Sequence, residues 1–130
     1  MSGSTLAAAF TLDVRAGRCG ITVIEASGEL DFYTGPMLRR SVAESVAAGN
    51  ALVVLDLDGL DFLDSTGLSV LVKGLKVCRA AGGAIAIARL PRRPEHTLQA
   101  AGVLKLFDLY DTVDAAENAM ASPSGAGPSR

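Results

Sequence analysis

One serine in this chain is well placed for chemistry. Ser65 lies in the segment LDSTGLS (residues 63–69), between an apolar, strand-like run and a helical pattern. A serine at such a junction can cap the helix through its hydroxyl oxygen. It can also carry a phosphate, which the positive end of the helix dipole favours. The residues around Ser65 must distinguish a structural serine from a regulatory one.

Capping alone does not explain the composition of this turn. A capping hydroxyl is worth about 1 kcal/mol, and Asp64 or Thr66 could supply the same hydrogen bond. Gly67 lowers the helix propensity of the first turn by up to about 1 kcal/mol. A glycine there would also let the surface of a partner approach closely. The surplus of capping residues favours a further role for Ser65.

Ser65 has no recognisable catalytic partner in the sequence. His96 is the only histidine, and it falls at the start of a short predicted helix, where a surface position is expected. The nucleophile elbow GxSxG is not matched, because glycine flanks the serine on one side only. The phosphate-binding patterns GxGxxG and GxxxxGK[ST] do not occur. We therefore expect no catalytic residue, no cofactor and no enzymatic activity.

Four aspartates near the serine suggest a metal site, but their spacing fails the test. Asp56, Asp58, Asp61 and Asp64 are close in sequence. A calcium loop of the EF-hand type needs glycine at its sixth position and glutamate at its twelfth. Counted from Asp56, these positions hold Asp61 and Gly67. Solvated loop carboxylates and helix caps are the better interpretation, so we expect no metal.

The composition limits the class of protein. The 130 residues suffice for one two-layer domain, and 49% apolar with 20% charged residues is ordinary for a globular protein. A net charge of −2 argues against direct binding of nucleic acid. The chain has no apolar run of about 18 residues and no basic stretch typical of a signal peptide. With its widely spaced Cys19 and Cys78, it is expected in the cytoplasm, without a membrane span.

Hydrophobic periodicity predicts strands that alternate with helices. The expected strands are 6–14, 21–26, 51–55, 84–88 and a short one within 104–109. The expected helices are 34–49 with Thr34 as N-cap, 65–82, 94–102 and one from Asp111 or Thr112 to Met120. This order predicts an α/β fold with a mixed, mostly parallel sheet of four to five strands. One domain is expected over residues 6–120, with a flexible lead-in at 1–5 and a disordered tail at 121–130.

The serine turn and a motif upstream of it resemble a known family. The segment LDSTGL (63–68) follows the strand at 52–56, and GELD stands at 28–31. This combination resembles the bacterial anti-sigma factor antagonists built on a STAS domain. The resemblance covers about residues 6–120 and includes the order of elements. It implies a STAS fold and a small, non-enzymatic switch protein.

The resemblance also implies partners and site residues. Proteins of this family bind an anti-sigma factor that is also a serine kinase, and thereby release a sigma factor for transcription. Phosphorylation of the motif serine breaks the complex, and a phosphatase of the PP2C type resets it. By this resemblance Ser65 is the phosphoacceptor; Thr66, where many relatives have a second serine, is the minor alternative. The implied partner-binding residues are Asp31, Asp64, Ser65, Thr66, Gly67 and Leu68.

Electrostatics predicts that phosphorylation would change binding more than folding. A phosphate at Ser65 adds roughly −1.5 to −2 charges. It gains on the order of 0.3–1 kcal/mol from the helix dipole and loses about 1 kcal/mol to repulsion from a solvated Asp64. An interface that covered it would have to desolvate an unpaired dianion, at a cost of several kcal/mol. The alternative function is a scaffold subunit of a sensory assembly or lipid transporter with the same fold and no phosphorylation switch.

Overall fold

A long strand, β2 (Thr22–Leu30), organises the sheet. In the computed structural model, which describes residues 10–121, β2 pairs antiparallel with β1 (Phe10–Ala16) and parallel with β3 (Leu52–Asp56). The strands β5 (Ala84–Ala88) and β6 (Asp108–Tyr110) continue the sheet in parallel, in the order β1-β2-β3-β5-β6. The predicted α/β class and the mixed, mostly parallel sheet are confirmed.

The sheet of the described region has a sixth strand that the sequence analysis does not predict. This strand, β4 (Leu60–Leu63), pairs in parallel with the last residues of β2, from Gly28 opposite Leu60 to Leu30 opposite Leu63. It therefore follows β3 along the same long partner strand. Only its first and last side chains are buried. Four residues with two buried positions are too few to give a recognisable strand periodicity.

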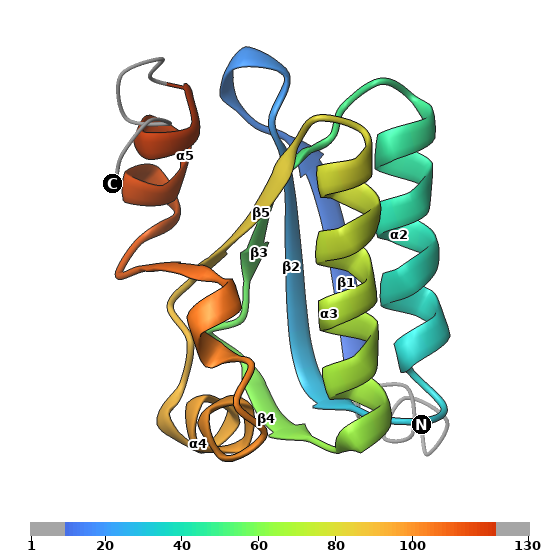
Figure 1. Cartoon of the computed structure of the whole chain (residues 1–130), viewed down its shortest axis with the longest axis vertical. Helices are drawn as coiled ribbons and strands as arrows, with labels where there is room; N and C mark the ends of the chain where they lie inside the picture. Colours follow the sequence, from blue (N-terminus) through green and yellow to red (C-terminus); the bar gives the residue numbers. More distant parts are fainter. Residues whose placement is uncertain (1–9, 122–130) are drawn as a thin grey trace, which may run out of the picture.

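Helices cover both faces of this sheet (Figure 1). The α-helices of the described residues are α2 (Gly35–Ala47), α3 (Ser65–Ala80), α4 (Arg92–Ala100) and α5 (Val113–Ala121), and the 3-10 helices are η1 (Arg18–Gly20) and η2 (Leu104–Leu106). The helices α2 and α3 lie side by side on one face, and α5 lies on the other (Figure 1). The buried core between sheet and helices includes Leu38, Val42, Leu71 and Leu75.

The small residues of β5 let a helix pack closely on one face of the sheet. Ile85 and Ile87 point into the core under α2 and α3. Ala86 and Ala88 point to the opposite face, where they share a buried cluster with Ala116 of α5. Because these alanines occupy little volume, α5 can pack closely against the sheet.

Several element boundaries differ from the expectation. Strand β1 ends at Ala16 and β2 at Leu30, beyond the expected ends at 14 and 26. Helix α4 begins at Arg92 rather than Pro94, because Pro91 occupies the N-cap position in an extended conformation. The short strand expected within 104–109 forms only at Asp108–Tyr110, since Leu104–Leu106 forms η2. Thr112, one of the two expected caps of α5, accepts a hydrogen bond from the Ala115 amide (3.0 Å).

The predicted terminal segments fall almost entirely outside the described residues. The expected lead-in, residues 1–5, lies there, and so does the expected tail apart from Ala121, which ends α5. The flexibility predicted for both ends stays a prediction. In the described part of the chain, no helix combines the length and apolar character that a membrane crossing requires.

An ion pair between a buried aspartate and a partly exposed arginine anchors the segment that leads from β3 to the serine turn. Asp56, whose side chain is 4% exposed, accepts hydrogen bonds from Nε and Nη2 of Arg89 at 3.0 and 2.7 Å. Next to it, the Leu57 amide donates to the Ala88 carbonyl (3.0 Å). Arg89 has a φ of 57°, in the left-handed region that is unfavourable for residues other than glycine. The bidentate contact offsets that cost and gives Asp56 a structural role.

Candidate functional site

Ser65 is the first residue of α3, and it does not cap the helix. Asp64 holds the N-cap position, and its Oδ1 accepts a hydrogen bond from the Gly67 amide at 2.9 Å. The Asp64 carbonyl accepts the Leu68 amide, also at 2.9 Å. Ser65 is exposed, and the side-chain hydrogen bonds formed among the described residues do not use its hydroxyl. The capping role therefore belongs to Asp64, and the Ser65 hydroxyl faces solvent.

The serine turn is attached to the end of β2. The Asp64 amide donates to the Leu30 carbonyl at 3.2 Å. Gly67 is buried against the same carbonyl: a Cβ atom there would overlap Leu30 O and lie 2.8 Å from Cδ1 of Leu63. From the sequence alone, Gly67 is expected to let the surface of a partner approach closely. In the structure the close approach is within the chain, so Gly67 lets α3 begin directly on top of β2.

Asp31, the residue after Leu30, holds the neighbouring loop in one conformation. Its Oδ1 accepts the amides of Tyr33 (2.9 Å) and Thr34 (3.0 Å). The Thr34 hydroxyl accepts the Asp31 amide (2.9 Å) and donates to the Glu29 carbonyl (2.7 Å). Thr34 occupies the predicted N-cap position of α2, but its side chain braces the loop and makes no cap bond to the helix. The amide of Thr34, and then that of Tyr33, lower the pKa of the Asp31 carboxyl, because both bonds favour its charged form.

The loop and the serine turn lie side by side at one end of the sheet, where β2 and β4 end and α2 and α3 begin (Figure 1). Gly35, the first residue of α2, packs against α3: a Cβ atom there would lie 3.0 Å from Cγ2 of Val70 and 3.8 Å from Cγ2 of Thr66. The fold therefore brings Asp31 next to the segment Asp64–Leu68, as the motif pair predicts. Within that segment Ser65 is exposed, its neighbour Thr66 is half-buried, and Gly67 is buried.

Two aromatic residues belong to this end of the molecule and are missing from the predicted site. The side chains of Phe32 and Tyr33 are 66% and 83% exposed, and their rings meet edge to face with centroids 5.3 Å apart. On the edge of the turn, Phe62 of β4 is 42% exposed. The sequence holds a signal for the pair, since Phe32 and Tyr33 are consecutive in a chain with only four Phe and two Tyr. Large apolar groups exposed together on a rigid loop are typical of interaction surfaces.

The groups suited to catalysis are not assembled around Ser65. His96 is exposed on α4 and lines a hollow with Asp61 and Phe62, on the side of β4 that faces α4. Residues 10–121 form no cluster of three or more side chains that could hold a metal ion. What the turn offers chemically is one accessible hydroxyl at the N-terminus of a 16-residue helix. Such a position accommodates added negative charge.

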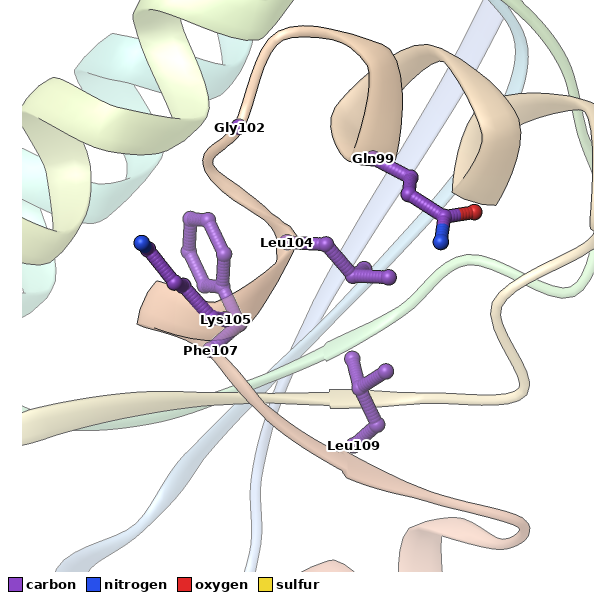
Figure 2. Close-up of a pocket in the computed structure, with 6 residues that line it drawn as sticks. All are labelled: Gln99, Gly102, Leu104, Lys105, Phe107 and Leu109. Atoms are coloured by element: carbon purple, nitrogen blue, oxygen red, sulfur yellow. The ribbon is translucent and has the colours of Figure 1, made fainter.

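A separate hollow of about 420 Å³ lies between the end of α4, η2 and β6 (Figure 2). Figure 2 shows Leu104 and Leu109 facing each other across it, with the amide of Gln99 and the ammonium group of Lys105 at its rim. These side chains can contact an apolar group, but they include no hydroxyl, thiol, imidazole or carboxylate. The serine turn is therefore the better candidate site.

Comparison with known proteins identifies the family of the chain. The family model for the STAS domain matches residues 14–116. An anti-sigma F factor antagonist of Paenibacillus polymyxa is 31% identical over 93 residues, which cover 71% of this chain and 80% of that protein. The anti-sigma-F factor antagonist RsfB of Mycobacterium tuberculosis is 32% identical over 96 residues, covering 72% and 76%. The crystal structure of an anti-sigma factor antagonist from Mycobacterium paratuberculosis superposes with a TM-score of 0.76 at 28% identity, covering 87% and 95%.

The contact of Gly67 with β2 predicts the effect of a methyl group. Gly67→Ala should lower the free energy of unfolding by about 1–3 kcal/mol, because the Leu30 backbone cannot yield as a flexible side chain would. The matched control is Gly74→Ala in the same helix, where the new Cβ would lie 3.5 Å from Cδ1 of Ile85, an ordinary contact. That variant should gain up to about 1 kcal/mol. Urea denaturation measures both, and a Gly67→Ala protein as stable as wild type would contradict the packing argument.

The hydrogen bonds of Asp31 predict a pH dependence of stability. Its folded-state pKa lies below the ordinary value of 3.8, so the ionised carboxylate stabilises the fold fully above 3.8. This contribution is lost as the pH falls through the lowered pKa. The carboxyl signal of Asp31 in an NMR titration should therefore have its midpoint below 3.8. The stability difference between wild type and Asp31→Asn should shrink at acidic pH, and a midpoint at or above the ordinary value would refute this account.

Proposed function

The chain belongs to the STAS domain family, and from this membership and the geometry of the serine turn we propose that it is an anti-sigma factor antagonist. In this proposal it binds an anti-sigma factor in the bacterial cytoplasm and thereby releases a sigma factor for transcription. Its own contribution is binding rather than catalysis. The relatives that are 31% and 32% identical carry the same functional name, which supports the assignment.

The observation that carries the proposed switch is the exposed hydroxyl of Ser65. Because the carboxylate of Asp64 caps α3, the fold has no need of this hydroxyl, and a kinase can modify it without breaking a structural bond. We assign Ser65 as the phosphoacceptor and Thr66, which is less exposed, as the minor alternative. The partner is then an anti-sigma factor with serine kinase activity, and a PP2C-type phosphatase removes the phosphate.

A phosphate on Ser65 would meet two opposing fields. The first amides of α3 have no carbonyl partner within the helix and favour a nearby anion. The Asp64 carboxylate is already bound to the Gly67 amide (2.9 Å) and repels a second negative charge. Since these effects are each about 1 kcal/mol in solvent, they leave the fold largely unaffected. A partner surface placed over the dianion has no such compensation, so the phosphate acts on binding.

The proposed contact surface surrounds this hydroxyl. It contains the exposed or half-buried residues Asp31, Asp64, Ser65, Thr66 and Leu68. Gly67 contributes through the position of the helix start, since its own backbone is buried. We add Phe32 and Tyr33, because they extend from the loop that Asp31 holds in place.

The switch is tested with variants of the serine and a purified anti-sigma factor kinase. Ser65→Ala should bind the kinase like the wild type and resist phosphorylation. Ser65→Asp should bind at least tenfold more weakly, since it places an unpaired charge in the interface. Ser69→Ala, one turn further along α3, is the matched control and should still be phosphorylated at residue 65. Mass spectrometry locates the phosphate and calorimetry gives the affinities.

Two results together would exclude the switch. One is an unmodified Ser65 after incubation with a kinase that is active on another substrate. The other is wild-type affinity of the Ser65→Asp variant for that kinase.

The aromatic pair should act as an anchor for the same partner. Phe32→Ala and Tyr33→Ala should each weaken binding about tenfold, because buried aromatic side chains dominate the energetics of interfaces. Neither change should lower the free energy of unfolding much, since both rings are mostly exposed. Val14→Ala on β1, where the side chain is 50% exposed, is the control and should bind normally. Normal binding by both aromatic variants would remove this loop from the interface.

A further inference from the structure

A groove separate from the serine turn runs between α2 and α3. It has a volume of about 340 Å³, and its apolar floor and sides are formed by Val42, Ala43, Gly74 and Val77. A second hollow shares Ala43 with it and continues along α2 to Met37, whose side chain is 47% exposed. Val42 is only 3% exposed at the bottom of the groove, whereas Val77 is 44% exposed at its side. The groove is therefore a recessed apolar surface.

Cationic side chains line both walls of this groove. Arg39 rises from α2, and Lys73 and Lys76 rise from α3. All three are exposed, and none forms an ion pair with a carboxylate of residues 10–121. Nearby, Arg40 pairs with Glu44 at 3.2 Å. The whole chain has a net charge of −2, but these three unpaired cations make the groove locally positive. An anionic partner would complement this charge.

Gly74 adds no shape of its own to this groove. A Cβ atom there would lie 3.5 Å from Cδ1 of Ile85 and 3.7 Å from Cγ1 of Val42, both core side chains in ordinary contact. Its φ is not among the positive values that favour glycine. An added methyl group would therefore extend toward the core between the helices and the sheet. The groove is defined by its apolar lining and by the cations beside it.

We infer that the α2–α3 groove is a second docking site, and that its occupant is an acidic amphipathic helix of a protein partner. The two helices lie side by side (Figure 1), so the seam between them is elongated. A helix laid into it can bury apolar residues at i, i+3, i+4 and i+7 on the floor. Its carboxylates can then reach Arg39 on one wall and the two lysines on the other. The recessed floor fits a helix better than it fits the flat surface of an anionic bilayer.

This site makes no use of the Ser65 hydroxyl, so its test is independent of the proposed switch. The probe is a fluorescent 18-residue peptide with leucines at those spacings and glutamates on both flanks; its partner probe is a scrambled peptide of equal composition. Titrated into the full ¹⁵N-labelled chain, the amphipathic peptide should shift amides around Arg39, Ala43, Lys73 and Val77. It should bind at least tenfold more tightly than the scrambled peptide. Added salt should weaken it, because the charges involved are exposed.

Charge-reversal variants show whether the peptide binds in the groove or is attracted by positive charge anywhere on the surface. The double change Arg39→Glu with Lys73→Glu should lower the affinity for the amphipathic peptide at least tenfold. Arg92→Glu, an exposed position on α4, is the matched control and should bind the peptide like the wild type. Circular dichroism shows whether the double variant is folded; Ala43→Glu, a single change at an exposed position of α2, serves as the second disruptive variant.

Three results would overturn the inference. The first is equal affinity for the amphipathic and the scrambled peptide, which would indicate charge attraction alone. The second is a set of shifted amides outside α2 and α3. The third is groove-dependent binding to vesicles of phosphatidylcholine and phosphatidylserine (4:1) without binding of the peptide, which would identify a lipid site.

Discussion

The contact between the Leu30 carbonyl and the start of α3 sets the geometry of the functional end. The Asp64 amide donates a hydrogen bond to this carbonyl, and Gly67 in the first turn of α3 packs against it. For this contact to exist, β2 must reach Leu30, β4 must pair along its last residues, and residue 67 must lack a side chain. Asp31 follows Leu30 directly, so the same carbonyl also fixes where the second loop begins. Two motifs that are separated by about thirty residues in sequence thus become one surface.

The sequence predicted the parts of this arrangement that depend on periodicity and on residue type. The apolar runs of β3 and β5 and the apolar stripe of α3 can be predicted without tertiary information. The family resemblance of the GELD and DSTG motifs links the two loops in the same way. Strand β4 could not be predicted, because its four residues form a strand only by pairing with a β2 that extends beyond its apolar core. The sequence also left open which residue caps α3, because Asp64, Ser65 and Thr66 all have side chains that can cap a helix. The direction in which the chain leaves β4 selects Asp64.

The roles of the glycines and aromatics show why local composition is insufficient. Gly67 and Gly74 are equivalent in a helical pattern, yet one lies against a backbone carbonyl and the other over ordinary side-chain contacts. Phe32 and Tyr33 would pass for core residues by type, but the hydrogen bonds of Asp31 close the loop in a way that leaves both rings in solvent. At the two glycines the decisive neighbours are distant in sequence, and at the aromatic pair the decisive contacts are the bonds from the Asp31 side chain to backbone amides. No propensity scale contains that information.

The proposed reversible switch needs two different groups. One group, the Asp64 carboxylate, caps the helix, and another, the Ser65 hydroxyl, is modified. If the Ser65 hydroxyl were the cap, a phosphate would remove a bond worth about 1 kcal/mol and disturb the helix start that the partner must recognise. Here the Asp64 carboxylate accepts that bond from the Gly67 amide, so in the proposed switch a phosphate on Ser65 would remove no cap bond. The phosphate can then change the charge of the surface while the backbone stays in place. In the proposed switch the energetic effect of modification would be concentrated in the interface, where desolvating a dianion costs several kcal/mol, and the same folded molecule would return when the phosphate is removed.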